Sequence, residues 1–341
     1  MVTIKDVARA AGVSHTTVSR ALNNSESVRP ETIAHIQKIA TELNYVANHN
    51  ARSLVQQKSY TVGLFFSSMF NGTSASFLMD AIKSVNEVLS GAYTVSVNGL
   101  DSLESFAAIT PRSYDGIILM SQSDSDDDFI AHVRQTEIPL VVVNRLLDDE
   151  RILNVAATDR LGVEEAVSYA ASLGHRHIGY IGGHGGFRAA TERREGFFAS
   201  MSRYDLPVRP ELMGNGDFIM EGGRREMTRM LALEQRPSCV FCANDDMAIG
   251  AMKACQELGL QIPADISIVS FDDIVFARYT SPALTTVHKP VDEISRFGAE
   301  KLLLLMQGKP VEKKQHLIQT YLVKRESLAP PKGGKVLPEL L

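Results

Sequence analysis

The sequence has no long run of apolar residues. Its apolar runs, such as Leu302–Met306 and Leu140–Val143, fall far short of the roughly 20 residues that a membrane-spanning helix needs. The segment Met1–Asp6 does not begin a basic stretch followed by an apolar one, which a secretion signal would require. We therefore expect no membrane partner and a cytoplasmic location.

Cysteine is also scarce. Cys239, Cys242 and Cys255 are the only three, and an odd number of cysteines gives no paired disulfide framework. Cys239 and Cys242 fit the CxxC pattern of zinc and redox sites, but no second such pair accompanies them. They lie in an apolar run that predicts a buried strand, where residues three apart point to opposite faces. We expect them to pack in a core rather than to bind metal.

The chain as a whole has no excess of positive charge, because its formal net charge is −5. The distribution of charge is uneven, however. Residues 1–58 carry seven Lys and Arg against four Asp and Glu, a charge of +3, which leaves −8 for the rest of the chain. A basic head on an acidic body is typical of a DNA-binding module joined to a second domain.

Two further patterns are weak signals for ligands. The loop Gly182–Gly186 does not fit the dinucleotide-binding GxGxxG motif, so we interpret it as a flexible loop near a pocket. The acidic run Asp124–Asp128 is favourable at the start of a solvated helix and is weak evidence for a cation site. The sequence indicates no catalytic acid–base pair, cofactor or metal, and therefore no enzyme.

The first 45 residues predict three short helices. Thr3 is a candidate N-cap with Asp6 three residues later, Gly12 ends the first helix, and Ser14 caps the second. Pro30 opens the third. From Tyr60 onward, short apolar runs alternate with amphipathic helical segments, which predicts parallel, doubly wound sheets. Roughly ten such units are enough for two sheets in series.

The segment from Asp6 to Arg20 has a helix-turn-helix signature. Glycine permits the tight turn, and the serine cap lets the N-terminus of the second helix enter the major groove of DNA. On that helix Val18, Ala21 and Leu22 face inward. The opposite side carries His15, Thr16, Ser19 and Arg20, because residues four apart share a helix face.

This head resembles that of the lactose-repressor/galactose-repressor family, from Ile4 through Asn23 and on to Ala51-Arg52-Ser53-Leu54. The resemblance implies that the last segment is a hinge helix whose leucine, Leu54, wedges into the minor groove. Val55 stands where relatives with this hinge carry lysine. The DNA-contacting residues that we predict are Thr3, Ser14, His15, Thr16, Thr17, Ser19, Arg20, Asn23, Ala51 and Leu54.

The body resembles the effector domain of the same family, which is similar to periplasmic sugar-binding proteins. Asn244–Met252 and Phe271–Ile274 carry much of this resemblance. Asp272 and Asn244 also follow apolar strands, and open α/β sheets bind ligands at the carboxyl ends of their strands. The resemblance implies effector contacts at Phe70, Arg193, Phe218, Asn244 and Asp272. The segment Val97–Tyr114 departs from the family and is shorter, with Pro111 where a helix usually runs.

The sequence thus predicts an all-α helix-turn-helix head (1–46), a hinge segment (47–58), an α/β body (59–329) and a flexible tail (330–341). The body would contain two doubly wound subdomains, 59–157 plus 288–317 and 158–287 plus 318–329. We expect a repressor that binds a palindromic operator as a homodimer, because one helix-turn-helix reads only a half-site. The expected effector is a sugar or sugar derivative; a purine or other metabolite acting as corepressor is the alternative.

Overall fold

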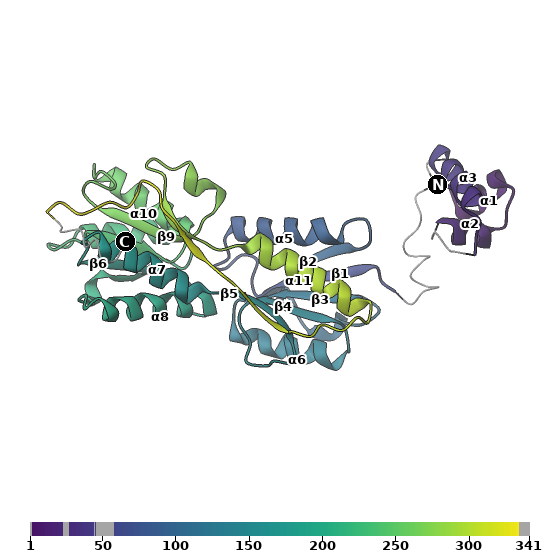
Figure 1. Ribbon diagram of the computed structural model, residues 1–341, viewed down its shortest axis with the longest axis horizontal. Helices are drawn as coiled ribbons and strands as arrows, with labels where there is room; N and C mark the ends of the chain where they lie inside the picture. The colour runs from purple at the N-terminus through teal and green to yellow at the C-terminus, as the bar shows by residue number, and fades with distance from the viewer. Residues whose placement is uncertain (1, 23–26, 44, 46–57, 334–341) are drawn as a thin grey trace. The chain divides into compact units, whose positions relative to one another are not determined.

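The computed structural model describes residues 2–22, 27–43, 45 and 58–333 (Figure 1). The chain divides into two compact units, Met1–Ser59 and Tyr60–Leu341, which we name the head and the body. The predicted hinge helix and the residues Asn23, Ala51 and Leu54 lie outside the described residues.

The head is built from α1 (Ile4–Ala11), α2 (His15–Leu22) and α3 (Pro30–Glu42). Their apolar faces meet in a small core made of Val7, Ala8, Val18, Ala21, Ile36 and Ala40. This core confirms the inward-facing positions predicted for the second helix, except that Leu22 is only half-buried.

The predicted caps of the head are present. The backbone N–H and hydroxyl of Thr3 donate to the Asp6 carboxylate at 2.9 and 2.7 Å. Gly12 ends α1 in the left-handed conformation, with φ of 65°. The Ser14 hydroxyl oxygen accepts a hydrogen bond from the Thr17 N–H at 3.1 Å, which fixes the start of α2.

The first sheet of the body has the strand order β11-β5-β4-β3-β1-β2, and all of its pairs are parallel. Figure 1 shows helices on both of its faces, with α5 and α11 on one and α6 on the other. Its elements are β1 (Thr61–Phe66), α5 (Ala75–Leu89), β2 (Thr94–Gly99), β3 (Gly116–Met120), α6 (Asp127–Gln135), β4 (Leu140–Asn144), β5 (Leu153–Ala157), α11 (Val291–Met306) and β11 (Gln315–Ile318).

The second sheet has the order β12-β10-β9-β8-β6-β7, and only the β10–β12 pair is antiparallel. Its elements are α7 (Asp159–Ser172), β6 (Ile178–Gly182), α8 (Arg188–Arg203), β7 (Met213–Asn215), α9 (Met220–Leu231), β8 (Cys239–Cys242), α10 (Asp245–Glu257), β9 (Ser267–Asp272), β10 (Thr285–His288) and β12 (Tyr321–Val323). The chain thus passes between the sheets after β5, after β10 and between β11 and β12.

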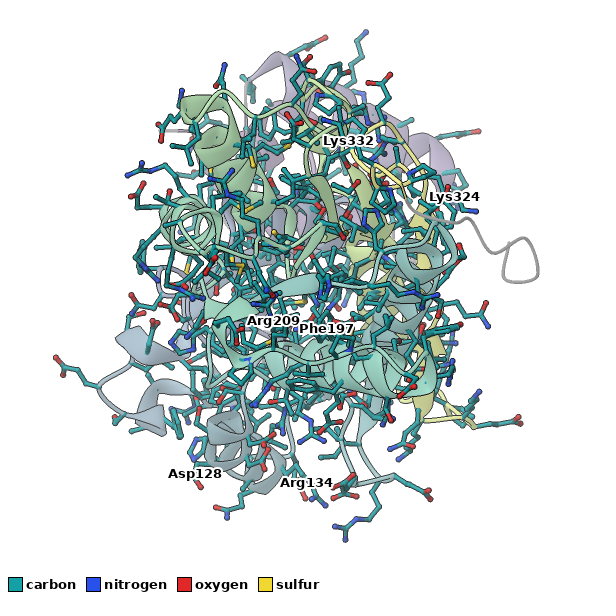
Figure 2. The ribbon with its side chains drawn as sticks, turned by 90° about the vertical axis from the view of Figure 1, so that its left-hand side faces the viewer. Asp128, Arg134, Phe197, Arg209, Lys324 and Lys332 are labelled. Carbon is teal, nitrogen blue, oxygen red and sulfur yellow. The ribbon has the colours of Figure 1, made fainter. Side chains whose placement is uncertain are left out.

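Each sheet has its own buried core, which confirms the predicted fold class for the head and body. Phe197 of α8, labelled in Figure 2, is fully buried against Tyr180 and Phe241. Cys239 and Cys242 are buried in β8, as expected. No helix among the described residues is both long and apolar enough to cross a membrane.

The segment between β2 and β3 is short, as the sequence indicates. It contains only the single turns η1 (Leu100–Ser102) and η2 (Phe106–Ala108). Sequence patterning did not find β5, β7, β10, β11 and β12, whose apolar residues are few or interrupted by polar ones.

Candidate functional site

The exposed side of α2 carries the polar residues that the sequence singled out. His15, Thr16 and Arg20 are exposed, whereas Thr17 and Ser19 are half-buried. The Ser14 hydroxyl contacts the hydroxyls of Thr16 and Thr17 at 2.9 and 2.8 Å. The N-terminal turn of α2 is therefore held in one arrangement while the side chains around it stay accessible, which is what reading a DNA groove requires.

In the body, a cavity of about 50 Å³ lies at the carboxyl ends of strands from both sheets. Four of the five predicted effector residues line it, namely Arg193, Phe218, Asn244 and Asp272. Phe70 does not line it, and its side chain is 80% exposed. The cavity also includes Gly72, Thr73, Ser74, Phe77, Gln122, Asn144, Phe187, Ala189 and Lys289.

The Arg193 guanidinium is the centre of a buried ion network. Its Nε donates to Asp159 Oδ2 at 3.0 Å, and its Nη2 donates to Asp272 Oδ1 at 2.9 Å. Its Nη1 donates to the Ala243 carbonyl, and its Cζ lies 3.9 Å from the centre of the Phe271 ring. Lys289 Nζ reaches the same Asp159 oxygen at 3.2 Å. Two cations and two carboxylates thus lie together, and all of them except the partly exposed Asp272 are buried.

The network shifts the pKa values of its members in opposite directions. Burial raises the pKa of Asp272, in spite of the nearby Arg193 and Lys289. Burial also acts to raise the pKa of Asp159, but Lys289 and Arg193 together hold it below its usual value. Burial lowers the pKa of Lys289. Perturbed groups of this kind gather at functional sites.

Three residues of the cavity wall adopt a left-handed backbone. The φ angles are 77° at Asn144, 63° at Phe218 and 114° at Asp272. Such a conformation costs about 1–3 kcal/mol per residue and is concentrated at ligand-binding sites. The strain is offset by the packing that aims these side chains into the cavity.

Asn244 and the neighbouring Asp245 form hydrogen bonds within the protein. The Asn244 side chain caps α10 by accepting from Met247 N–H at 2.9 Å, and its Nδ2 donates to the Phe218 carbonyl at 3.1 Å. Asp245 accepts hydrogen bonds from the Ser270 and Thr286 hydroxyls, and burial raises its pKa to about 8. Asn244 therefore holds Phe218 in place, and Asp245 holds the loop after β9 by accepting from the Ile274 N–H.

The two halves of the body are in close contact around the cavity. The Arg188 N–H donates to the Gln122 carbonyl at 2.7 Å. A Cβ placed on Gly72 would lie 3.0 Å from the Cβ of His184, which shows how closely these loops approach. This cavity, at about 50 Å³, is far smaller than the usual ligand-site volume of about 300–1,000 Å³.

A second cavity of about 210 Å³ shares Gln122, Asn144 and Ala189 with the first and adds Asp159. Asp159 Oδ1 and Asn144 Oδ1 are buried in these walls and have no hydrogen-bond donor within the described structure. A buried acceptor without a donor costs about 1–3 kcal/mol. The pair of oxygens fits a ligand that supplies two hydrogen-bond donors.

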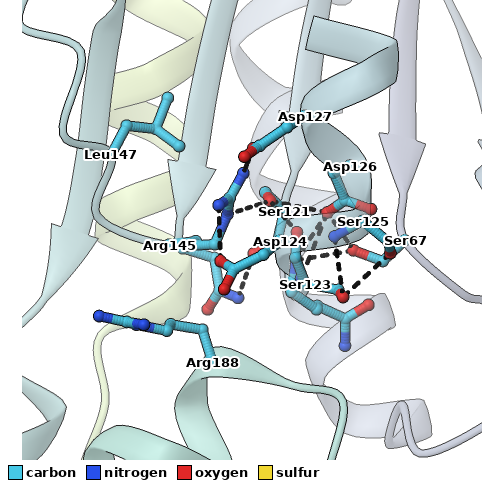
Figure 3. Close-up of polar contacts among 12 residues, drawn as sticks. Ser67, Ser121, Ser123, Asp124, Ser125, Asp126, Asp127, Arg145, Leu147 and Arg188 are labelled. Carbon is cyan, nitrogen blue, oxygen red and sulfur yellow. Dashed lines mark hydrogen bonds and ion pairs between the residues drawn. The ribbon is translucent and has the colours of Figure 1, made fainter.

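The acidic run Asp124–Asp128 contacts an arginine of the chain (Figure 3). The Arg145 side chain is 5% exposed; it donates to Asp124 Oδ1 at 2.8 Å and also pairs with Asp127. Asp126 accepts hydrogen bonds from the hydroxyls of Ser67 and Ser121 at 2.6 and 2.7 Å. These contacts join the ends of β1, β3 and β4 into one rigid wall beside the second cavity.

Sequence reasoning missed Asn144, Asp159 and Lys289. Asn144 and Lys289 stand at or just after strand ends, as Asp272 does. The rule that found Asp272 would have found Asn144, since an apolar run precedes it. Lys289 and Asp159 follow strands that the sequence pattern did not reveal.

Comparison with known families matches both units of the chain. Residues 3–48 match the family model described as "Bacterial regulatory proteins, lacI family". Residues 167–328 match a "Periplasmic binding protein-like domain".

Two curated relatives cover nearly the whole chain. The sequence is 48% identical over 328 residues to the "Probable HTH-type transcriptional repressor ExuR" of Bacillus subtilis, covering 96% of this chain and 98% of the relative. It is 36% identical over 339 residues to the "HTH-type transcriptional repressor PurR" of Proteus mirabilis, with 96% and 97% covered.

Two solved structures share the fold. The lac repressor dimer bound to operator and the anti-inducer ONPF superposes with a TM-score of 0.80 at 28% identity, covering 96% of this chain and 99% of that one. The complex of the transcriptional regulator CelR with cellobiose gives a TM-score of 0.71 at 26% identity, with 96% and 100% covered.

Proposed function

Because this chain belongs to the lacI family of bacterial regulatory proteins and is a transcriptional repressor rather than an enzyme, we propose that it is a cytoplasmic repressor controlled by a sugar. It binds a palindromic operator as a homodimer. Its effector is a polyol held between the two halves of the body. The head corresponds to residues 1–46, the hinge to 47–58 and the effector-binding body to 59–329.

The observation that carries the sugar assignment is the pair of unpartnered acceptors within the described residues, Asp159 Oδ1 and Asn144 Oδ1. A sugar presents several hydroxyl donors on a rigid ring, whereas a purine has few. The Phe218 ring, 5.7 Å from the Arg193 guanidinium, can pack on an apolar face of a sugar. The bound cellobiose in the CelR structure agrees with this class of ligand.

A thermal-shift screen of the full chain tests this assignment. The panel contains cellobiose, ribose, glucuronate, a sugar phosphate and hypoxanthine. At a ligand concentration of 100 times Kd, binding adds about 2.7 kcal/mol to the free energy of unfolding. A rise in the melting temperature with sugars supports the proposal, whereas a rise with hypoxanthine alone would establish the purine-type alternative.

Base reading by α2 gives the next prediction. His15→Ala and Thr16→Ala are each expected to change the preferred operator bases, because each removes a direct hydrogen bond to a base, worth about 1–3 kcal/mol of discrimination. Both residues are exposed at the N-terminal turn of α2, which leaves their side chains free to contact bases. Binding-site selection on random duplexes measures the preference. His35→Ala, which removes an exposed histidine of α3, should leave the selected sequence unchanged; equal behaviour of all three variants would contradict the assignment.

Leu54 and Ala51 complete the proposed operator contacts at the hinge. By the family resemblance, Leu54 wedges between base pairs, a contact that affects only kinked, specific sites. Non-specific binding rests mainly on phosphate contacts, so it would be independent of this side chain.

Dimer formation is assigned to an apolar surface on the second half of the body. Val275, Phe276 and Tyr279 are 58%, 60% and 76% exposed, and Ile219 and Met220 of the α9 end are about half exposed. The α9 helix packs tightly on α10, where Gly250 abuts the Met220 carbonyl. The exposed apolar side chains of the segment 275–279 mark an interaction surface. A second copy of the chain is the occupant, because lacI-family repressors form dimers, as in the lac repressor structure.

Phe276→Asp is expected to convert the dimer into monomers at micromolar concentration, since it places a charge in a desolvated interface. Sedimentation velocity measures the change. Val208→Asp, which alters a residue that is 44% exposed elsewhere on the body, is the matched control and should remain dimeric. A Phe276→Asp protein that is still a dimer at that concentration would place the interface elsewhere.

A further inference from the structure

A hollow of about 610 Å³ lies between α8 and the β6–β7 edge of the second sheet, outside the cavity already described. Its volume falls in the usual range for small-molecule sites. Its lining is Tyr180, Gly182, Gly183, Gly185, Ala190, Thr191, Arg194, Glu195, Phe198, Met213, Gly214 and Asn215. None of the residues proposed for effector binding is among them.

The hollow has one buried polar group without a partner. The Tyr180 side chain is 3% exposed, and its hydroxyl makes no hydrogen bond in the described part of the chain. Burial raises the pKa of Tyr180, so the hydroxyl keeps its proton. A buried donor without an acceptor is unfavourable, and a bound molecule with an acceptor would relieve that cost.

The remaining lining favours a neutral, apolar molecule. Phe198, Met213 and Ala190 supply apolar surface. The two charged residues, Arg194 and Glu195, are exposed and opposite in sign, and neither forms an ion pair within the described residues. The lining therefore carries no net charge that would select an ion.

Glycines let the chain at the end of β6 pack closely against residues of both the hollow and the effector cavity. A Cβ on Gly182 would lie 2.9 Å from the Tyr180 ring, and one on Gly183 would lie 2.0 Å from the Phe218 ring of the effector cavity. Helix α8 likewise presents Arg193 to the effector cavity and Arg194 to the hollow. The loop after β6 is thus a wall shared by both.

We propose that this hollow is a second ligand site, which takes a neutral ring compound with one hydrogen-bond acceptor for the Tyr180 hydroxyl. The proposed sugar effector occupies the other side of the shared wall. The two sites are distinct, since their polar groups differ.

Calorimetric titration of the full chain with benzamide, benzoate and benzylamine tests this proposal. These probes share one ring and differ in head-group charge. Benzamide should bind saturably and more tightly than the two ions. Preference for benzoate or benzylamine would overturn the neutral class, and no saturable heat with any of the three would overturn the site.

Three variants test the position. Tyr180→Phe should weaken benzamide binding about three- to tenfold, the loss of one hydrogen bond, while its melting temperature stays equal or rises because an unpaired hydroxyl is removed. Thr191→Trp, at an exposed position of α8, should fill the hollow and abolish binding. Asp272→Asn should leave benzamide binding unchanged. If Tyr180→Phe and Thr191→Trp bind benzamide with unaltered affinity, or if Asp272→Asn loses benzamide binding, the hollow is not the benzamide site. Either result would leave the proposal of a sugar effector untouched.

Discussion

Replacing Arg193 by Met is expected to lower the free energy of unfolding by about 3–5 kcal/mol at neutral pH, the cost of breaking a buried ion pair by removing one partner. The guanidinium bonds Asp159 and Asp272, and its side chain is 4% exposed. Without it, only Lys289 remains near the buried Asp159 and the partly buried Asp272. Chemical denaturation with urea measures the change.

The loss should depend on pH with a definite sign. Burial raises the pKa of the Asp272 carboxyl in the folded protein, and the variant lacks the Arg193 charge that opposes this rise. Groups of this kind stabilise the fold below the unfolded pKa, and that stabilisation is lost as the pH rises through the folded pKa. The deficit of Arg193→Met relative to the wild type should therefore shrink as the pH falls from 8 toward 5.

Arg188→Met is the matched control for this experiment. Arg188 stands on the same helix, is about half exposed, and pairs with Glu192 at 3.3 Å. A surface pair of this kind contributes roughly 0–1 kcal/mol. If Arg193→Met costs no more than Arg188→Met, or if its cost is independent of pH, the buried network does not stabilise the body as described.

Asp272→Asn is expected to weaken effector binding by roughly one to two powers of ten. Asparagine keeps one acceptor oxygen but replaces the other with a donor, so one hydrogen bond from a sugar hydroxyl to an ionised carboxylate is lost. Such a bond is worth about 1.5–3 kcal/mol, at about 1.4 kcal/mol per tenfold. Operator binding without effector should be unchanged. Coupling between the sites is reciprocal, so the variant should show the ligand-free response at every ordinary effector concentration.

Operator affinity with and without the sugar found in the thermal-shift screen measures this response. Asp273→Asn is the matched control, since Asp273 is the next residue but bonds Arg325 and His288 and does not line the effector cavity. The control should respond as the wild type does. A folded Asp272→Asn protein with the wild-type response would remove Asp272 from the effector site.

Much of the architecture follows from local sequence patterns. The caps at Thr3 and Ser14 and the turn at Gly12 depend on residues within four positions of one another. The alternation of apolar runs with amphipathic segments fixed the fold class, because a strand buried on both faces must be apolar throughout. The same rule explains why β7 and β12 were missed: they are edge strands, and edge strands are half exposed.

The sequence by itself also predicted that Arg193, Phe218, Asn244 and Asp272 lie together, from the family resemblance for all four and from strand ends for Asn244 and Asp272. The four residues line one cavity. The sequence did not determine their partners. Only the tertiary structure brought Lys289 to Asp159 across 130 residues of chain, and only it left the Asp159, Asn144 and Tyr180 oxygens buried without partners among the described residues. It also turned Asn244 toward the Phe218 carbonyl and Phe70 into solvent. The physical reason is that burial and ion pairing between distant segments depend on how two sheets meet at their edges, which no local pattern of residues encodes.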